Sequence, residues 1–158
     1  MRTTSQIKRI ALAAVGAALL AQAADALASD WSTYAPRKFG YLFADKQELV
    51  KNGETVKFWS AQAPAHIEPG TPVYTKDAYV VDCRQHTFKV VQSTQYDASE
   101  QATDVPVVMQ SREIEPDSKE DALSQFACGT DKGVWMPVTA VAEFFHERAK
   151  NAKQGLSY

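Results

Sequence analysis

Two cysteines are the residues of this sequence whose chemistry is easiest to anticipate. Cys83 and Cys128 are the only cysteines of the chain, and in an oxidising compartment an even pair predicts one disulfide. The alternative is two buried free thiols. A redox site is less favoured because no Cys-x-x-Cys motif occurs, and a metal site would need further ligands at short spacing. We therefore expect a structural Cys83–Cys128 bridge.

Residues for acid–base or nucleophilic catalysis do not gather in a recognisable motif. His66, His86 and His146 lie in three separate segments. Glu143 and His146 are three residues apart on a predicted helix and could hold a metal weakly, but a solvated pair is the favoured interpretation. The chain has no Gly-x-Ser-x-Gly elbow and no glycine-rich phosphate loop. We therefore predict no enzyme, no cofactor and no metal, with a site assembled from distant residues as the alternative.

The N-terminal residues 1–28 have the order of a secretory signal peptide. A basic start precedes an uncharged apolar run, Ile10–Leu20, and two small-residue cleavage patterns then end at Ala23 and Ala28. We expect cleavage after Ala28, with Ala23 as the alternative. The apolar run is shorter than the roughly 20 residues that a permanent anchor needs, so no stable membrane anchor is expected. The mature protein should be periplasmic, secreted or held at the cell surface.

Composition excludes several classes of partner. The chain has a formal net charge of −2 and no basic stripe, and the signal segment would remove more bases than acids. A mildly acidic domain is a poor candidate for nucleic-acid binding. The 45% hydrophobic content is typical of a chain that folds around a core. We divide the mature part into a β-rich domain, residues 29–128, and a helical extension, residues 129–158.

Turn residues and alternating apolar positions predict the strands. Asn52-Gly53 predicts a type I′ hairpin between Gln47–Lys51 and Thr55–Gln62. Val56 and Phe58 should share one face of that hairpin, with Lys57 and Trp59 on the other. Residues 29–38 are interpreted as a lead-in to the first strand. The other expected strands are Phe39–Phe43, Val73–Cys83, Thr87–Gln92 and, within Val105–Ile114, the residues Pro106–Gln110.

One helix should cover the sheet. Ser118 is followed three residues later by Asp121, close to a capping box, and Cys128-Gly129 provides a helix end. The helix would therefore be tied to the strand that ends at Cys83. We predict an α+β fold: a small antiparallel β-sheet with a helix disulfide-linked to it, plus an extra C-terminal helix.

The extra helix is predicted over Val138–Ala152, with Pro137 at its start. Its apolar stripe favours a helix packed on the edge of the domain. Phe144 falls outside that stripe, and Arg148 lies among the basic residues of the last turns. The alternative is a partner-binding helix that presents Phe144 and Arg148. Exposed aromatic side chains elsewhere would also mark a binding surface, although the sequence does not say which are exposed.

The order of these features resembles the surface-adhesin protein E-like domain of Gram-negative bacteria. The most specific part is Tyr79-Val80-Val81-Asp82-Cys83. The remaining matching pieces are Trp31, Tyr41 to Asp45, Asn52-Gly53, Val56 to Trp59, Arg84, Thr87-Phe88, Tyr96-Asp97, Ile114 to Ser118 and Cys128. The resemblance implies a single antiparallel sheet with a helix fastened by the disulfide, and a place at the bacterial surface or in the periplasm.

The resemblance also implies a function. It suggests an exported, non-enzymatic adhesin domain for host extracellular-matrix or serum proteins. The alternative is a soluble periplasmic envelope protein that binds an endogenous partner and has no adhesin role. The partner is a protein in both cases. Sheet edges also make a homodimer possible.

Overall fold

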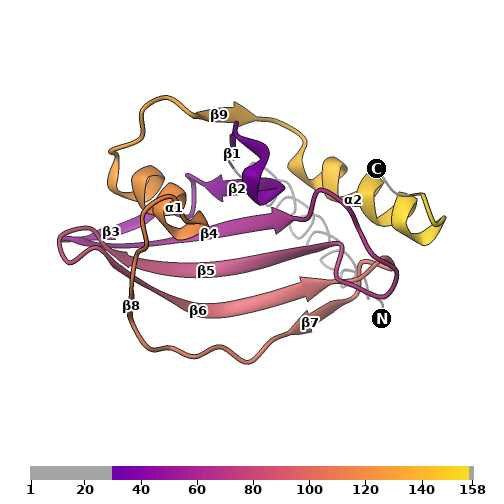
Figure 1. The fold of residues 1–158 in the computed structure, drawn as a ribbon, viewed down its shortest axis with the longest axis horizontal. Helices are drawn as coiled ribbons and strands as arrows, with labels where there is room; N and C mark the ends of the chain where they lie inside the picture. The colour runs from indigo at the N-terminus through magenta and orange to yellow at the C-terminus, as the bar shows by residue number, and fades with distance from the viewer. Residues whose placement is uncertain (1–29, 157–158) are drawn as a thin grey trace, which may run out of the picture.

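The computed structural model describes residues 30–156, so the predicted signal peptide and its cleavage sites lie outside the described residues. Figure 1 shows a large twisted sheet with one helix near each end. The strands are β1 (Trp31–Tyr34), β2 (Tyr41–Asp45), β3 (Val50–Asn52), β4 (Thr55–Ala63), β5 (Tyr74–Asp82), β6 (Thr87–Tyr96), β7 (Ala102–Asp104), β8 (Arg112–Glu113) and β9 (Trp135–Val138). The helices are the short 3-10 helix η1 (Arg37–Phe39), α1 (Lys119–Cys128) and α2 (Val141–Lys153).

The strands form one antiparallel sheet in the order β7-β6-β5-β4-β2-β1-β9, with β3 also paired to β4 and β8 to β6. Nine strands within the described residues make this sheet larger than the small one expected. The α+β assignment holds broadly, since the architecture is mostly antiparallel sheet with two helices. No helix within residues 30–156 has the length and apolar character needed to cross a membrane.

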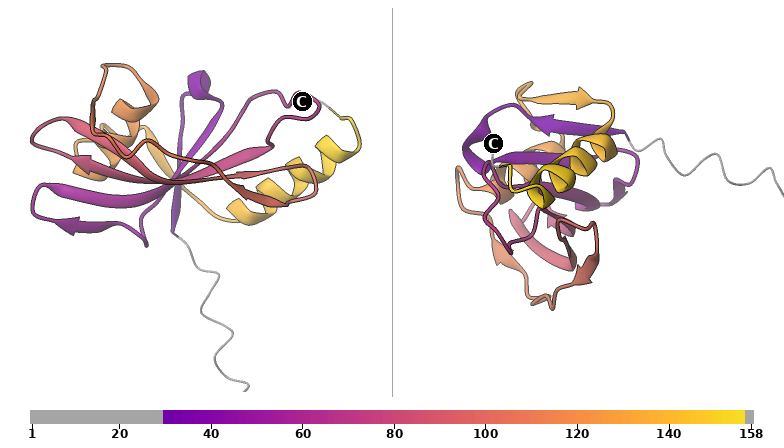
Figure 2. Two further views of the ribbon diagram at one scale, coloured as in Figure 1. Left: turned by 90° about the horizontal axis from the view of Figure 1, so that it is seen from below. Right: turned by 90° about the vertical axis from the view of Figure 1, so that its right-hand side faces the viewer.

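The two helices pack on opposite faces of the sheet, which the left view of Figure 2 shows nearly edge-on. On one face, α1 covers a core that includes Val56, Phe58, Tyr79 and Leu123, each at most 1% exposed. The strand period of two sends Lys57 and Trp59 to the other face, as the alternation predicted. On that other face, α2 covers a second, smaller core cluster.

Helix α1 forms for the reasons that its sequence suggests. The Ser118 hydroxyl accepts a hydrogen bond from the Asp121 N–H, and Gly129 ends the helix in the left-handed conformation. Cys83 and Cys128 form a disulfide with their Cα atoms 5.8 Å apart. The bridge joins the end of α1 to the residue that follows β5.

The β3–β4 hairpin forms where it was predicted, but its turn lies one residue further on. Asn52 pairs with Thr55, so Gly53 and Glu54 are the two loop residues. Gly53 has a φ of 59°. A glycine with positive φ at the first loop position is typical of a type II′ turn rather than the predicted type I′.

Three further expectations about elements were wrong. The lead-in contains β1, which pairs with both β2 and β9. The strand expected from Phe39 starts at Tyr41, because Phe39 ends η1. Pro137 lies in β9 rather than at a helix start, and α2 begins at Val141. An edge strand tolerates proline because one of its sides needs no donor for a sheet partner.

Candidate binding groove

The connection between β7 and β8 gives the sheet an incomplete edge. Residues 94–96 of β6 pair with β7, and residues 87–88 pair with β8. Between these ladders, residues 105–111 form no strand, so the prediction of a strand over Pro106–Gln110 was wrong. These residues cannot continue the ladder in register because the connection is too long. It has two residues more than residues 89–93, the part of β6 that it spans. The extra backbone bows outward.

The bowed connection leaves apolar side chains in solvent. Val108 is 80% exposed and Met109 is 63% exposed. A pocket of about 460 Å³ lies between the connection, the sheet and the start of α1. Its floor includes Tyr79 of β5 and Val90 of β6. The loop and the strand edge together form one wall of an open groove.

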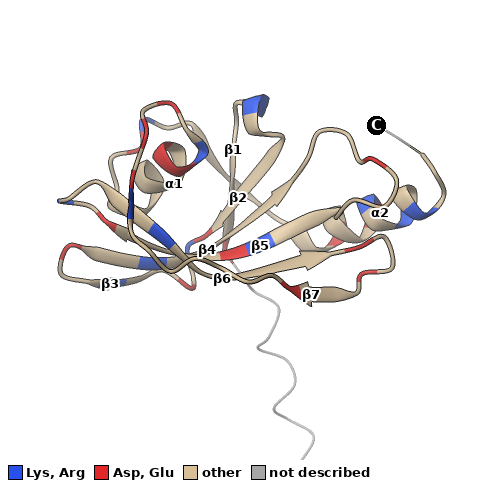
Figure 3. Ribbon diagram, turned by 60° about the horizontal axis from the view of Figure 1, so that its bottom comes forward, with Lys and Arg blue, Asp and Glu red and all other residues tan. Residues whose placement is uncertain are grey.

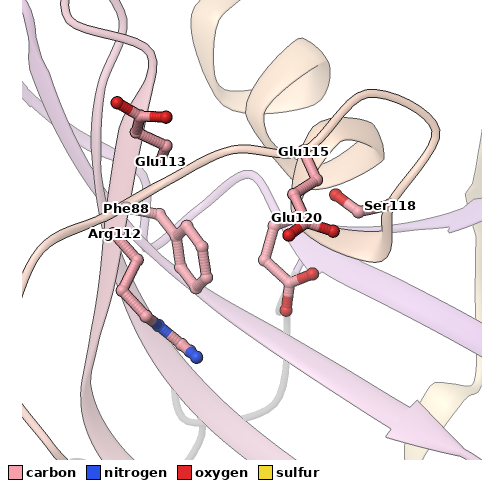
Figure 4. Close-up of a pocket in the computed structure, with 6 residues that line it drawn as sticks. All are labelled: Phe88, Arg112, Glu113, Glu115, Ser118 and Glu120. Carbon is pink, nitrogen blue, oxygen red and sulfur yellow. The ribbon is translucent and has the colours of Figure 1, made fainter.

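A second pocket continues this groove toward α1. It has a volume of about 530 Å³ and shares Arg112 and Glu120 with the first pocket. Figure 4 shows the Phe88 ring in the middle, Arg112 on one side, and the Glu115 and Glu120 carboxylates together on the other. We call the two pockets the β8–α1 groove. Its lining residues are Asp77, Tyr79, Phe88, Val90, Ser93, Val105, Pro106, Val107, Val108, Gln110, Arg112, Glu113, Glu115, Ser118, Lys119 and Glu120.

Acidic side chains outnumber basic ones in the β8–α1 groove. The bases are Arg112 and Lys119, whereas the acids are Asp77, Glu113, Glu115 and Glu120. Figure 3 shows acidic residues in red on the segment that leads into α1, on the first turn of that helix and on β5. The groove therefore combines apolar surface with an excess of negative charge.

Both bases are engaged by neighbours. The Arg112 guanidinium lies 4.9 Å from the Phe88 ring centroid. Lys119 Nζ lies 3.8 Å from a Glu120 carboxylate oxygen and donates a hydrogen bond of 3.1 Å to Gln62 Oε1. Lys119 thus offsets part of the Glu120 charge, whereas Glu113 and Glu115 are exposed acids.

The floor tyrosine stays a neutral phenol. Burial raises the pKa of Tyr79 well above its ordinary value, and the carboxylates of Asp77 and Glu120 add to that rise. Arg112 acts in the opposite direction. The Ser118 hydroxyl serves as the cap of α1. These groups are suited to packing and hydrogen bonding rather than to proton transfer near neutral pH.

Of the sequence-predicted site residues, the two cysteines are bonded to each other and are structural. Phe144 lies half-buried against the sheet, 5.0 Å from the Tyr41 ring and 5.3 Å from the Phe43 ring, centroid to centroid. Arg148 is only 6% exposed. Both side chains pack between the helix and the sheet, whereas the alternative had them presented to a partner. A partner-binding role for Phe144 and Arg148 stays a prediction.

Glu143 and His146 on α2 were considered as a weak metal-binding pair, but the structure gives His146 a different partner. His146 Nδ1 lies 3.1 Å from a carboxylate oxygen of Glu100. Glu100 lies in the loop between β6 and β7. Within residues 30–156, no group of three or more histidine, cysteine or acidic residues is placed to hold a metal ion.

Sequence reasoning missed the β8–α1 groove. The sequence alone shows Glu113 and Glu115 as two acids beside Pro116 and Phe88 as a residue of a predicted strand, with nothing that brings them together. The groove exists because β8 pairs with the start of β6, which no local pattern reveals. The available signal was the proline in Pro106–Gln110, which disfavours a regular strand.

Two solved structures of Haemophilus influenzae protein E are similar to this chain. The first, crystal form II, has 13% sequence identity and a TM-score of 0.47, covering 56% of this chain and 80% of that one. The second has 11% identity and a TM-score of 0.49, covering 62% and 84%.

A search of curated proteins finds no match. The family model described as Surface-adhesin protein E matches residues 31–129, which is more than half of the chain. That range runs from the start of β1 to the glycine that ends α1. The resemblance proposed from the sequence is confirmed, and this chain belongs to the Surface-adhesin protein E family.

Proposed function

We propose that this protein is an exported, non-enzymatic binding domain that recognises host extracellular-matrix or serum proteins through the β8–α1 groove. The observation that carries the proposal is the incomplete edge of β6 beside an open, acidic groove in a domain of this family. A polypeptide partner suits such a site because an extended segment offers backbone groups to a strand edge and side chains to the adjoining pockets.

The charge of the groove selects the kind of segment. Four acids against two bases favour a partner segment rich in lysine or arginine. Val108 supplies an apolar contact at the rim, where its exposure otherwise costs solvation free energy. A basic segment with apolar residues at intervals fits both features.

The test is direct binding of the purified chain to immobilised matrix and serum proteins. The double variant Glu113→Lys/Glu115→Lys should weaken binding about tenfold or more, which is about 1.4 kcal/mol. Both residues are exposed and precede α1, so the fold should be retained. The matched control Glu68→Lys/Glu143→Lys makes the same charge change away from the groove and should bind like the wild type.

A second variant tests the apolar rim. Val108→Ser should also weaken binding without lowering the melting temperature, because this side chain lines the groove and is largely exposed. Equal binding by the wild type and both groove variants would contradict a role for the groove. Failure to bind any matrix or serum protein would contradict the adhesin function.

The rival function is a periplasmic protein with an endogenous partner. Protease accessibility on intact cells, beside a permeabilised control, separates the two. Cleavage on intact cells supports the adhesin proposal, whereas cleavage only after permeabilisation supports the periplasmic one. The groove variants remain useful in the second case, because the same surface would then be tested against envelope proteins.

A further inference from the structure

A second pocket lies on the opposite sheet face, beside the area that α2 covers. Strand pairing brings its residues together from distant parts of the chain. Trp31 pairs with Asp45, and Trp59 pairs with Ala78, which in turn pairs with Gln92. These side chains form one row across β1, β2, β4, β5 and β6.

The next row completes the pocket. Lys76 pairs with Thr94 on the same face as the first row. The hollow between the rows has a volume of about 340 Å³, lined by both tryptophans, Asp45, Lys76, Gln92 and Thr94 among others. Pockets that hold small ligands start at about 300 Å³, so the hollow suits one compact ring rather than a long chain. We call it the Trp31–Trp59 pocket.

Asp45 is the most informative group in this pocket. The residue is 2% exposed, yet it lines the hollow. One carboxylate oxygen accepts a hydrogen bond of 2.9 Å from the Gln47 N–H. Among the described residues, no other hydrogen bond and no cation within 4.0 Å engages this carboxylate. An ionised carboxylate has about four acceptor positions, so most of its capacity is left for a ligand or for water.

Lys76 supplies the complementary donors. Its Nζ lies 5.6 Å from the Trp31 ring centroid and 5.9 Å from the Trp59 ring centroid. The cation is therefore held near both rings, and no hydrogen bond or ion pair to a residue within 30–156 engages its three N–H donors. Gln92 lines the same pocket. The pocket thus presents aromatic surface, donors and acceptors within one small space.

The mixture of charges narrows the class of ligand. A small anion would face the carboxylates of Asp45 and Glu48, whereas a small cation would face the ammonium of Lys76. A neutral ring with several hydroxyl groups meets neither repulsion. Its hydroxyls donate to Asp45 and accept from Lys76 and Gln92, and its C–H face packs on an indole ring.

We propose that the Trp31–Trp59 pocket binds a neutral saccharide unit, a hexose or an N-acetylhexosamine of a glycan. This site lies on the face opposite the β8–α1 groove, so it is independent of protein binding there. Trp59 provides the stacking surface, because it is the less buried of the two tryptophans. Asp45 and Lys76 orient the hydroxyl groups.

The test is a titration of the full exported chain with methyl β-galactoside, methyl α-mannoside and N-acetylglucosamine at millimolar concentrations. Binding is followed by tryptophan fluorescence and by saturation-transfer NMR. At least one saccharide should bind. Trp59→Ala should weaken that binding about tenfold or more, and Trp59→Phe should retain part of it. Asp45→Asn keeps the acceptor for the Gln47 N–H but removes the charge, so it should also weaken binding.

Controls keep the result specific. Lys57→Ala changes an exposed side chain two residues from Trp59 on the same face, outside the pocket, and should bind like the wild type. Circular dichroism and melting temperature identify any variant that fails to fold, and Trp59→Phe then carries the comparison. Absence of binding by all three saccharides would overturn the proposal. So would binding that ignores both Trp59→Ala and Asp45→Asn, or binding of the zwitterion phosphocholine in place of the saccharides.

Discussion

Nη2 of Arg148, on α2, donates a hydrogen bond of 2.6 Å to the carbonyl oxygen of Pro64, in the loop that follows β4. The same guanidinium lies 4.8 Å from the Tyr41 ring centroid and 5.6 Å from the Phe144 ring centroid. One side chain thus links the C-terminal helix to a loop 84 residues earlier in the chain and to the aromatic side chains beneath the helix.

Arg148→Ala should therefore destabilise the protein. Loss of a buried charged donor that bonds a carbonyl oxygen costs about 1.5–3 kcal/mol, and the lost packing on Tyr41 adds to that cost. The measurement is urea unfolding of the variant and the wild type. Lys150→Ala, at an exposed position on the same helix, is the control and should change stability by less than about 0.5 kcal/mol. Equal effects of the two substitutions would contradict the anchoring role of Arg148.

The disulfide should stabilise the fold mainly by lowering the conformational entropy of the unfolded chain. Its cysteines are 45 residues apart, and closing a loop of this size corresponds to about 4 kcal/mol in the chain-entropy model. Cys83→Ser and the double variant Cys83→Ser/Cys128→Ser should both lower the free energy of unfolding by about 2–5 kcal/mol. A reducing agent should lower the melting temperature of the wild type and leave the double variant unchanged. A wild type that melts alike with and without reductant would contradict the prediction.

Alkaline pH should destabilise the fold through Tyr79. Its pKa is raised in the folded protein, whereas an unfolded tyrosine titrates near pH 10. Above that pH only the unfolded state releases the phenol proton, so stability present at neutral pH is lost as pH rises. This group alone contributes a fall of about 1.4 kcal/mol per pH unit there. Tyr79→Phe should show a shallower fall between pH 10 and 11 in urea unfolding.

Tyr74 should contribute in the same direction. Burial raises its pKa to about 12, with Tyr96 and Glu100 adding to the shift. The comparison of Tyr79→Phe with the wild type measures the contribution of Tyr79 alone to the pH dependence of stability, because Tyr74 is present in both proteins. Equal slopes for the two proteins would contradict the assignment to Tyr79.

Removal of α2 should make the domain self-associate. Phe43, Ala61 and Ala63 are at most 3% exposed, and they form one cluster with Val141 and Phe145 of the helix. A chain ending at Val138 would expose this apolar surface. We expect increased binding of the dye ANS and concentration-dependent oligomers in sedimentation analysis. A truncated chain that stays monomeric and binds no dye would show that α2 is not required as a cover.

Local sequence signals predicted much of the fold, and their failures have a common cause. Ser118 and Gly129 bound α1 as expected because capping depends on neighbouring residues alone. The pairing of β1 with β9 joins residues about a hundred positions apart, and no local pattern encodes it. The bowed connection at 105–111 depends on the register of β6 with both β7 and β8.

The candidate sites show the same difference between features set by local sequence and features set by strand pairing. The disulfide needed only two cysteines and an exported chain. The β8–α1 groove needed the register of a short edge strand, and the Trp31–Trp59 pocket needed pairing across five strands. Exposure of Phe144 and Arg148 remained open as an alternative because a helical stripe does not show how an amphipathic arginine packs on aromatic rings.

Hydrogen exchange of the complex tests the central claim most directly. A matrix or serum protein that binds the chain is added, and protection of backbone amides is compared with that of the free chain. We predict new protection in residues 87–93 and 105–113, with little change in α2. Protection confined to α2, or spread evenly over the sheet, would contradict recognition through the β8–α1 groove.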